Sequence, residues 1–167
     1  MVDSQEQAIE VILNDTLKPG MALVIRYEGP KGGPGMQEML YPTSFVKGKG
    51  IGKQVAMLTD GRYSGGSSGL AIGTWRLRLP TNGAQVRAHQ ERRHHDIDIE
   101  ARSVNVELTD EQLDERRREL EAGDGLQWAH RNRHVSQALK AYAAFARSAD
   151  KGATRDPELI NKLSGLN

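Results

Sequence analysis

The sequence predicts a mixed α/β domain, and two observations carry that prediction. Helical and strand patterns alternate in the first half of the chain, which is typical of parallel sheets. Two strand patterns then follow one another directly at residues 97–108, which favours local antiparallel pairing. The 167 residues are enough to bury one core and do not require a second. We therefore expect a single domain over residues 1–167.

The chain opens with a predicted helix and a predicted strand. Ser4 followed by Gln7 resembles a capping box, in which side chains bind backbone N–H groups of the first helical turn. Apolar residues behind this pair recur at helical spacing and predict a helix over residues 4–14. A proline-glycine turn then leads into the short apolar run 21–25, which is typical of a buried strand.

The next elements flank glycine-rich turns. Apolar residues over 36–46 fit a helix, and Pro42 is expected to end or bend it because proline has no N–H to donate. A second apolar strand is expected at 54–59. Residues 97–108 alternate apolar and polar side chains, as half-exposed strands do.

The last third of the chain is predicted to be mainly helical. Thr109 is expected to cap a charged helix that ends at Gly123. Residues 134–149 have a strong amphipathic pattern and predict another helix. The polar segment 151–167 is expected to be a loosely held tail.

Composition excludes several classes of function. With 23 basic and 22 acidic residues, the chain has no net attraction for nucleic acid or an anionic membrane surface, and neither is an expected partner. It contains no cysteine, so by itself it cannot form disulfides, thiolate metal sites or a thiolate-held cluster. There is no basic and apolar leader and no apolar run of about 18 residues, so the cytoplasm is the expected compartment.

Residues 26–73 are the candidate functional segment. Glycine-dense turns flank an apolar strand there, and the same stretch holds the carboxylate of Glu38 and the hydroxyls of Ser64, Ser67 and Ser68. Glycine at this density costs backbone entropy and adds no packing, so it is tolerated where the chain must turn sharply or lie close to a ligand. Taken alone, Glu38 also fits a solvated helix carboxylate, and Ser64 fits a turn residue that hydrogen-bonds locally.

The motifs of this segment resemble those of a known enzyme family. The run RYEGPKGGPGMQEML, followed by LTDGRYSGGSSGLAIG, is similar to the C-terminal domain of the dihydroxy-acid, sugar-acid and 6-phosphogluconate dehydratases. Further along, IDIEARSVNVELTDEQLDERR and NRHVSQALKAYAAFARSADKGA resemble that family's later strands and its terminal helix. The resemblance implies a swivelling β/β/α domain, a compact mixed sheet or barrel flanked by helices, that caps the active site of a larger domain.

The resemblance also implies roles for particular residues. The acid of the GPGMxEM turn is a magnesium ligand in the family and falls on Glu38, a hard oxygen ligand of the kind that Mg²⁺ prefers. The first serine of DGRxSGG is the family's proton acceptor and falls on Ser64, which needs a preorganised polar site to become an alkoxide. The residues expected to bind the substrate carboxylate through amides or hydroxyls are Gly65, Gly66, Ser67 and Ser68.

The implied reaction eliminates water from a 2,3-dihydroxy carboxylic acid and yields a 2-keto acid, as in isoleucine and valine biosynthesis. In the family, magnesium chelates the substrate carboxylate and 2-hydroxyl, and an iron of an iron-sulfur cluster accepts the departing 3-hydroxyl. The cluster's cysteines and further magnesium ligands belong to a larger N-terminal domain. The implied partners are that cluster-bearing domain, a small dihydroxy-acid substrate and a second subunit in a homodimer. The isolated polypeptide, which lacks cysteine, is expected to be catalytically inert.

Residues 74–95 depart from the family's pattern. They contain five arginines, three histidines and a single acid, although their length is close to that of the family segment they replace. We hypothesise that two compensating frame shifts produced them, and one uninterrupted reading frame in resequenced DNA would overturn this. A solvated connection is a further interpretation, and a basic arm for nucleic acid is disfavoured because no aromatic platform accompanies it.

Two other functions stay open on the sequence alone. A sugar-acid dehydratase is the nearest enzymatic alternative, although the ADKGA ending favours the branched-chain pathway. A non-catalytic carboxylate-binding module, or a decayed fragment without activity, is the alternative from another class. Binding of a dihydroxy acid without turnover would favour the module.

Overall fold

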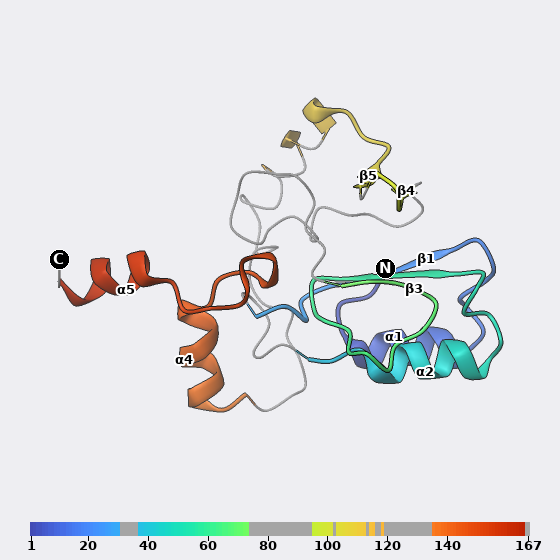
Figure 1. Ribbon diagram of the computed structural model, residues 1–167, viewed down its shortest axis with the longest axis horizontal. Coiled ribbons are helices and arrows are strands. Elements are labelled where there is room, and N and C mark those ends of the chain that lie inside the picture. The colour runs from blue at the N-terminus through green and yellow to red at the C-terminus, as the bar shows by residue number, and fades with distance from the viewer. Residues whose placement is uncertain are drawn as a thin grey trace.

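The computed structural model describes residues 1–30, 37–73, 95–101, 103–112, 114–115, 118 and 135–165. Its strands form two sheets with helices beside them (Figure 1). The strands are β1 (Ala22–Ile25), β2 (Ala56–Thr59), β3 (Leu70–Ile72), β4 (His95–Asp98) and β5 (Ser103–Val106). The helices are α1 (Gln5–Leu13), α2 (Leu40–Gly48), α4 (Gln137–Phe145) and α5 (Pro157–Ser164), with a short 3-10 helix η2 at Ala149–Lys151.

The predicted mixed α/β class is confirmed. Strands β1, β2 and β3 are parallel and lie in that order, with Ala22 opposite Ala56 and Ala56 opposite Leu70. Strands β4 and β5 are antiparallel, with His95 opposite Val106. Of the two expected forms, sheet or barrel, the described residues adopt open sheets that do not close into a barrel.

Helices α1 and α2 cover one face of the parallel sheet (Figure 1). Side chains on this face are buried in one cluster, which includes Ala8 and Ile12 of α1, Val46 of α2, and Ile25 and Met57 of the strands. Apolar residues recur every three or four positions along α1, so one side of the helix faces the sheet and the other faces water. The main core therefore lies between the two helices and the strands.

The hairpin β4–β5 covers the opposite face. Successive residues of a strand point to opposite faces, so Val24, Ala56 and Leu58 form a second buried cluster on the side away from the helices. Ile97 and Val104 of the hairpin pack against this cluster. The resulting order of layers is helices, parallel sheet and hairpin, which is a β/β/α arrangement (Figure 1).

Helix α1 begins where the sequence predicts. The Ser4 hydroxyl oxygen accepts a hydrogen bond from the Gln7 N–H at 3.1 Å. In return, Gln7 Oε1 accepts from the Asp3 N–H at 2.8 Å. Each side chain satisfies a donor that the helix itself leaves unpaired, which sets the first turn.

Helix α2 begins and ends later than predicted. It starts at Leu40 and continues through Pro42 to Gly48, so of the two effects predicted for Pro42, that it ends the helix is wrong. Pro42 is the third residue of α2, and the first N–H groups of a helix have no acceptor within it. The donor that proline lacks is therefore not missed at this position.

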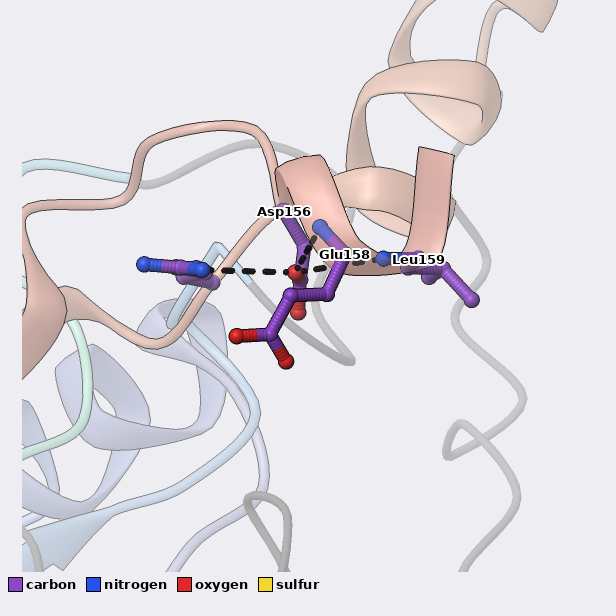
Figure 2. A network of polar contacts seen from close by, with 4 residues as sticks. Asp156, Glu158 and Leu159 are labelled. Carbon is purple, nitrogen blue, oxygen red and sulfur yellow. Dashed lines mark hydrogen bonds and ion pairs between the residues drawn. The ribbon is translucent and has the colours of Figure 1, made fainter. Parts of the chain in front are cut away.

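Two elements near the C-terminus meet through Asp156 (Figure 2). Its Oδ1 accepts from the N–H groups of Glu158 at 3.1 Å and Leu159 at 3.3 Å, which caps α5. The same oxygen pairs with the Arg147 guanidinium, just after α4, at 3.4 Å. Helix α5 lies within the segment for which the polar sequence predicts a loose tail, and none of its side chains is buried. That 151–167 is a loosely held tail stays a prediction.

Of the remaining predictions, some agree with the structure at least in part, and others concern residues that the structure does not describe. The expected cap at Thr109 is confirmed, because its Oγ1 accepts from the Gln112 N–H at 3.3 Å. Helix α4 is shorter than the predicted 134–149 and is capped by Ser136. Gly123 and all but the last residue of 74–95 lie outside the described residues. No helix among the described residues is long and apolar enough to cross a membrane.

Candidate active site

The carboxyl ends of the three parallel strands carry the candidate active site. Ligands of α/β proteins commonly bind just beyond such ends. The chain that follows β2 runs through Asp60 and Tyr63 to Ser64. The residue after β3 lies against it, because a Cβ added at Gly73 would be 3.0 Å from Tyr63 Cδ2. A side chain at Gly73 would therefore require Tyr63 to shift, because the two strand ends approach closely there.

The structure brings Glu38 and Ser64 together. The Ser64 N–H donates to Glu38 Oε1 at 3.2 Å, although the two residues are 26 positions apart. Backbone pairing fixes this approach, because Glu38 forms a parallel bridge with Arg62. In addition, the Met39 N–H donates to the Arg62 carbonyl at 3.0 Å, and the Met39 side chain is fully buried. The predicted metal ligand, Glu38, and the predicted base, Ser64, therefore lie next to each other.

The residues after Ser64 form a tight turn. The Ser67 N–H donates to the Ser64 carbonyl at 3.1 Å. A Cβ added at Gly66 would lie 3.9 Å from the Ser64 hydroxyl oxygen, so this hydroxyl lies near the unhindered backbone of Gly66. Gly65 has no other heavy atom within 4 Å of the place a Cβ would take. Backbone at both glycines is thus accessible to a small ligand.

Two serine hydroxyls of the turn occupy different surroundings. The Ser67 hydroxyl oxygen is buried and has no hydrogen-bond partner among the described residues. An unpaired buried hydroxyl is unfavourable, so it is suited to a ligand that supplies the missing partner. Ser68 instead lines an open hollow of about 430 Å³.

This hollow lies between the serine turn and α2, and sequence reasoning missed three of its polar residues. Its lining residues are Thr43, Ser44, Lys47, Gly48, Gly66 and Ser68. The three missed residues lie three, four and seven positions after Leu40, the first residue of α2, so helical periodicity places them on one side of α2. That spacing was the available signal, but nothing local indicated that the serine turn would face this side.

Tyr63 separates the site from the core. Its ring packs against the main buried cluster, and its hydroxyl is buried without a partner among the described residues. Burial raises the pKa of the Tyr63 phenol well above its ordinary value, because the charged form is poorly solvated there. Tyr63 is therefore neutral at physiological pH and is not a candidate base.

The described residues fit part of a magnesium site and no part of a thiolate-held cluster. Mg²⁺ is usually held by one or two carboxylates together with water and substrate, and the Glu38 carboxylate has the chemistry of one such ligand. No group of three or more acids, histidines or cysteines capable of holding a metal occurs among the described residues. Because the chain has no cysteine, the ligands of any iron-sulfur cluster must come from elsewhere.

A family model described as Dihydroxy-acid/6-phosphogluconate dehydratase C-terminal matches residues 1–153. The chain therefore belongs to this family of dehydratases and corresponds to its C-terminal domain, as the motifs predicted. A dihydroxy-acid dehydratase of Bifidobacterium longum subsp. infantis is 86% identical over 166 residues, which cover 99% of this chain and 26% of that protein. The dihydroxy-acid dehydratase of Bifidobacterium adolescentis is 77% identical over the same length. The chain thus spans about a quarter of the length of these relatives.

Proposed function

We propose that this chain forms the C-terminal part of a dihydroxy-acid dehydratase, a hydro-lyase of isoleucine and valine biosynthesis. The observation that carries the proposal is the 3.2 Å hydrogen bond from the Ser64 N–H to Glu38 Oε1. This hydrogen bond brings Glu38, the proposed magnesium ligand, and Ser64, the proposed base, to the same edge of the sheet. The names of the Bifidobacterium relatives support the dihydroxy-acid substrate class.

Ser64 is proposed to remove the proton from C2 of the substrate. The electron pair of that C–H bond forms the C2–C3 double bond while the C3–O bond breaks. The departing hydroxide and the proton taken by Ser64 together make up the water that is lost, and the enol tautomerises to the 2-keto acid. Magnesium, when bound, would withdraw charge through the substrate carboxylate and 2-hydroxyl and so acidify the C2 proton. Glu38 is the residue of this chain proposed to hold that ion.

The serine turn is proposed to bind the substrate carboxylate. Accessible backbone at Gly65 and Gly66 offers amides to an anion, as in backbone nests. The buried hydroxyl of Ser67 has no partner among the described residues and gains one if the carboxylate enters. Ser68 borders the adjoining hollow and is proposed to contact the remainder of the substrate.

A sugar-acid dehydratase is the second candidate, and the hollow is the observation that favours it. Ser44, Lys47 and Ser68 give the hollow polar groups that suit a hydroxylated or anionic substrate tail better than a branched alkyl group. Measured kcat/KM for 2,3-dihydroxyisovalerate against a five- or six-carbon sugar acid decides between them. A preference for the sugar acid would replace the branched-chain assignment and leave the roles of Glu38 and Ser64 unchanged.

The proposed activity needs the rest of the enzyme. We propose that the larger N-terminal region of the relatives supplies the cluster-binding cysteines and the other magnesium ligands, and that the whole enzyme is a cytoplasmic homodimer. The isolated chain is accordingly expected to show no turnover with a dihydroxy acid and Mg²⁺. If calorimetry on the isolated chain detects binding of that acid and the full-length enzyme also shows no turnover, a carboxylate-binding module is favoured. If neither the isolated chain nor the whole enzyme shows binding or turnover of that acid, a decayed fragment is favoured.

The decisive experiment substitutes both residues in the full-length enzyme. Ser64→Ala should lower kcat by about 10²- to 10⁴-fold, the usual worth of a general base, while Mg²⁺ binding is retained. Glu38→Gln should weaken both turnover and Mg²⁺ binding. The matched controls are Ser148→Ala, whose hydroxyl caps no helix, and Glu10→Gln on the exposed side of α1. Near-normal kcat in Ser64→Ala would refute the proposed base.

A further inference from the structure

A buried carboxylate lies beneath the candidate site, in the turn that follows β1. Glu28 is only 1% exposed, and its Oε1 accepts from the Gln5 N–H at 2.8 Å. Gln5 is the first residue of α1, so the carboxylate lies at the positive end of the helix dipole. A charged group is excluded from water at such cost that it persists only where specific partners replace the water. Glu28 therefore links α1 to the end of β1.

The residue before Glu28 has a strained backbone. Tyr27 has a φ of +61° and is 8% exposed. A bulky side chain rarely adopts this left-handed conformation, which persists only where the surroundings hold it, often near functional sites. At Tyr27 the left-handed turn lets the ring stay buried while the next side chain reaches α1.

The backbone of Glu28 is joined to the turn after β2. Its N–H donates to Asp60 Oδ1 at 2.9 Å. The two turns are also closely packed, because a Cβ added at Gly61 would lie 3.1 Å from Glu28 Cβ. Likewise, a Cβ added at Gly29 would lie 2.9 Å from the Asp60 carbonyl oxygen. Small movements of Glu28 must therefore move Asp60 and Gly61 with it.

The turn after β2 leads directly to the proposed catalytic pair. Arg62 follows Gly61, and its carbonyl accepts from the Met39 N–H at 3.0 Å while its backbone bridges Glu38. Two residues later, the Ser64 N–H binds the Glu38 carboxylate. A continuous path of backbone and hydrogen bonds thus runs from the buried carboxylate to the pair.

We propose that Glu28 is a positioning residue: its carboxylate anchors to α1 the backbone that holds the Asp60–Arg62 turn, and it thereby sets the separation of Glu38 and Ser64. The contacts given above join it to α1 and to the Asp60–Arg62 turn, and no role in proton transfer is proposed for it. The proposal rests on the proposed function only for its catalytic consequence. The coupling of Glu28 to residues 60–68 can be tested by a measurement that does not depend on enzyme activity.

The test compares three variants of the full-length enzyme. Glu28→Ala removes the acceptor for the Gln5 N–H, Glu28→Gln retains an oxygen in its place, and Glu10→Gln is the control on the exposed side of α1. The first measurement is hydrogen–deuterium exchange of the metal-free proteins. Glu28→Ala should exchange faster over residues 60–68 with α4 unchanged, Glu28→Gln should lie between it and wild type, and Glu10→Gln should match wild type.

The second measurement is kcat of the loaded enzyme at saturating substrate and Mg²⁺. Displacement of a catalytic group by about 1 Å costs on the order of 10²-fold, so a loss of that size is expected for Glu28→Ala, with partial recovery in Glu28→Gln. Wild-type exchange over 60–68 and wild-type kcat in Glu28→Ala would overturn the proposal. Faster exchange throughout the protein, with normal kcat per folded enzyme, would also overturn it because Glu28 would then act on stability alone.

The experiment also covers two further cases, a Glu28→Ala variant that does not fold and an enzyme that lacks the proposed activity. If Glu28→Ala does not fold, Glu28→Gln carries the test, and exchange over 60–68 equal to that of Glu10→Gln overturns the proposal. If the wild-type enzyme has no dehydratase activity, or Ser64→Ala retains it, the proposed function fails. The exchange comparison still decides whether Glu28 holds the turn.

Discussion

Gly69→Ala tests whether the serine turn and β3 are held in place by the close approach of two backbone segments. Gly69 has a φ of +86°, and a Cβ added there would lie 2.6 Å from the Gly52 carbonyl oxygen. The opposing atom belongs to the backbone and cannot rotate away. Gly20 provides a matched control, because its φ is +84° and a Cβ added there meets nothing within 4 Å.

The two substitutions share one cost and differ in another. The left-handed backbone should cost each alanine about 1–2 kcal/mol. The contact with Gly52 should cost Gly69→Ala a further 1–3 kcal/mol or so, the usual penalty of overpacking. We therefore expect a loss of unfolding free energy of about 2–5 kcal/mol for Gly69→Ala and about 1–2 kcal/mol for Gly20→Ala.

Urea unfolding of the chain, followed by far-ultraviolet circular dichroism, measures both losses. If the isolated chain shows no cooperative transition, pulse proteolysis of the full-length enzyme supplies the same comparison. Equal losses in the two variants would show that the loop containing Gly52 gives way without cost. The close packing inferred between that loop and the start of β3 would then be refuted.

Three further outcomes are expected. The Leu159 N–H, followed by the Arg147 side chain, lowers the pKa of Asp156 below its ordinary 3.8. The stabilisation of α5 is therefore complete above pH 3.8 and is lost as the pH falls through the lowered pKa. The protection factors of the α5 amides, which correct for the pH dependence of intrinsic exchange, should fall only at that acid end, and a fall near neutral pH would contradict this. Tyr63→Phe removes a buried hydroxyl without a described partner and should leave the thermal midpoint unchanged or raise it, whereas a clear fall would reveal a partner. Leu58→Ala, at a fully buried position of β2, should cost about 2–5 kcal/mol in unfolding free energy, and the half-exposed Leu13→Ala should cost much less, with equal costs counting against the assigned core.

Much of the secondary structure follows from local pattern. The capping pair of Ser4 and Gln7, the apolar run that becomes β1, and the alternation over 97–108 each form the element they predict. These signals work because helix caps and side-chain periodicity depend on residues a few positions apart. Pro42 was misjudged because its effect depends on how far it lies from the start of the helix, which periodicity alone does not locate.

Strand β3 and helix α5 show where local pattern is too weak. Strand β3 has three residues between glycines, and its partner β2 decides that it pairs at all. Helix α5 does have local signals, namely its caps Asp156 and Gly165 and the proline in its first turn, but it lies within a segment whose polarity suggests a loose tail. Short elements carry too few residues for their intrinsic preferences to outweigh those of coil.

The sequence by itself determined the dehydratase family, through two long motifs in order, and indicated Glu38 and Ser64 as candidate functional residues. Only the tertiary structure decided that the Ser64 N–H reaches the Glu38 carboxylate across 26 positions and that Glu28 is buried against the turn that leads to Ser64. The physical reason is that a motif records which groups are present, while their separation is set by the parallel pairing of β1 and β2 and by turns that pack closely enough to exclude a side chain.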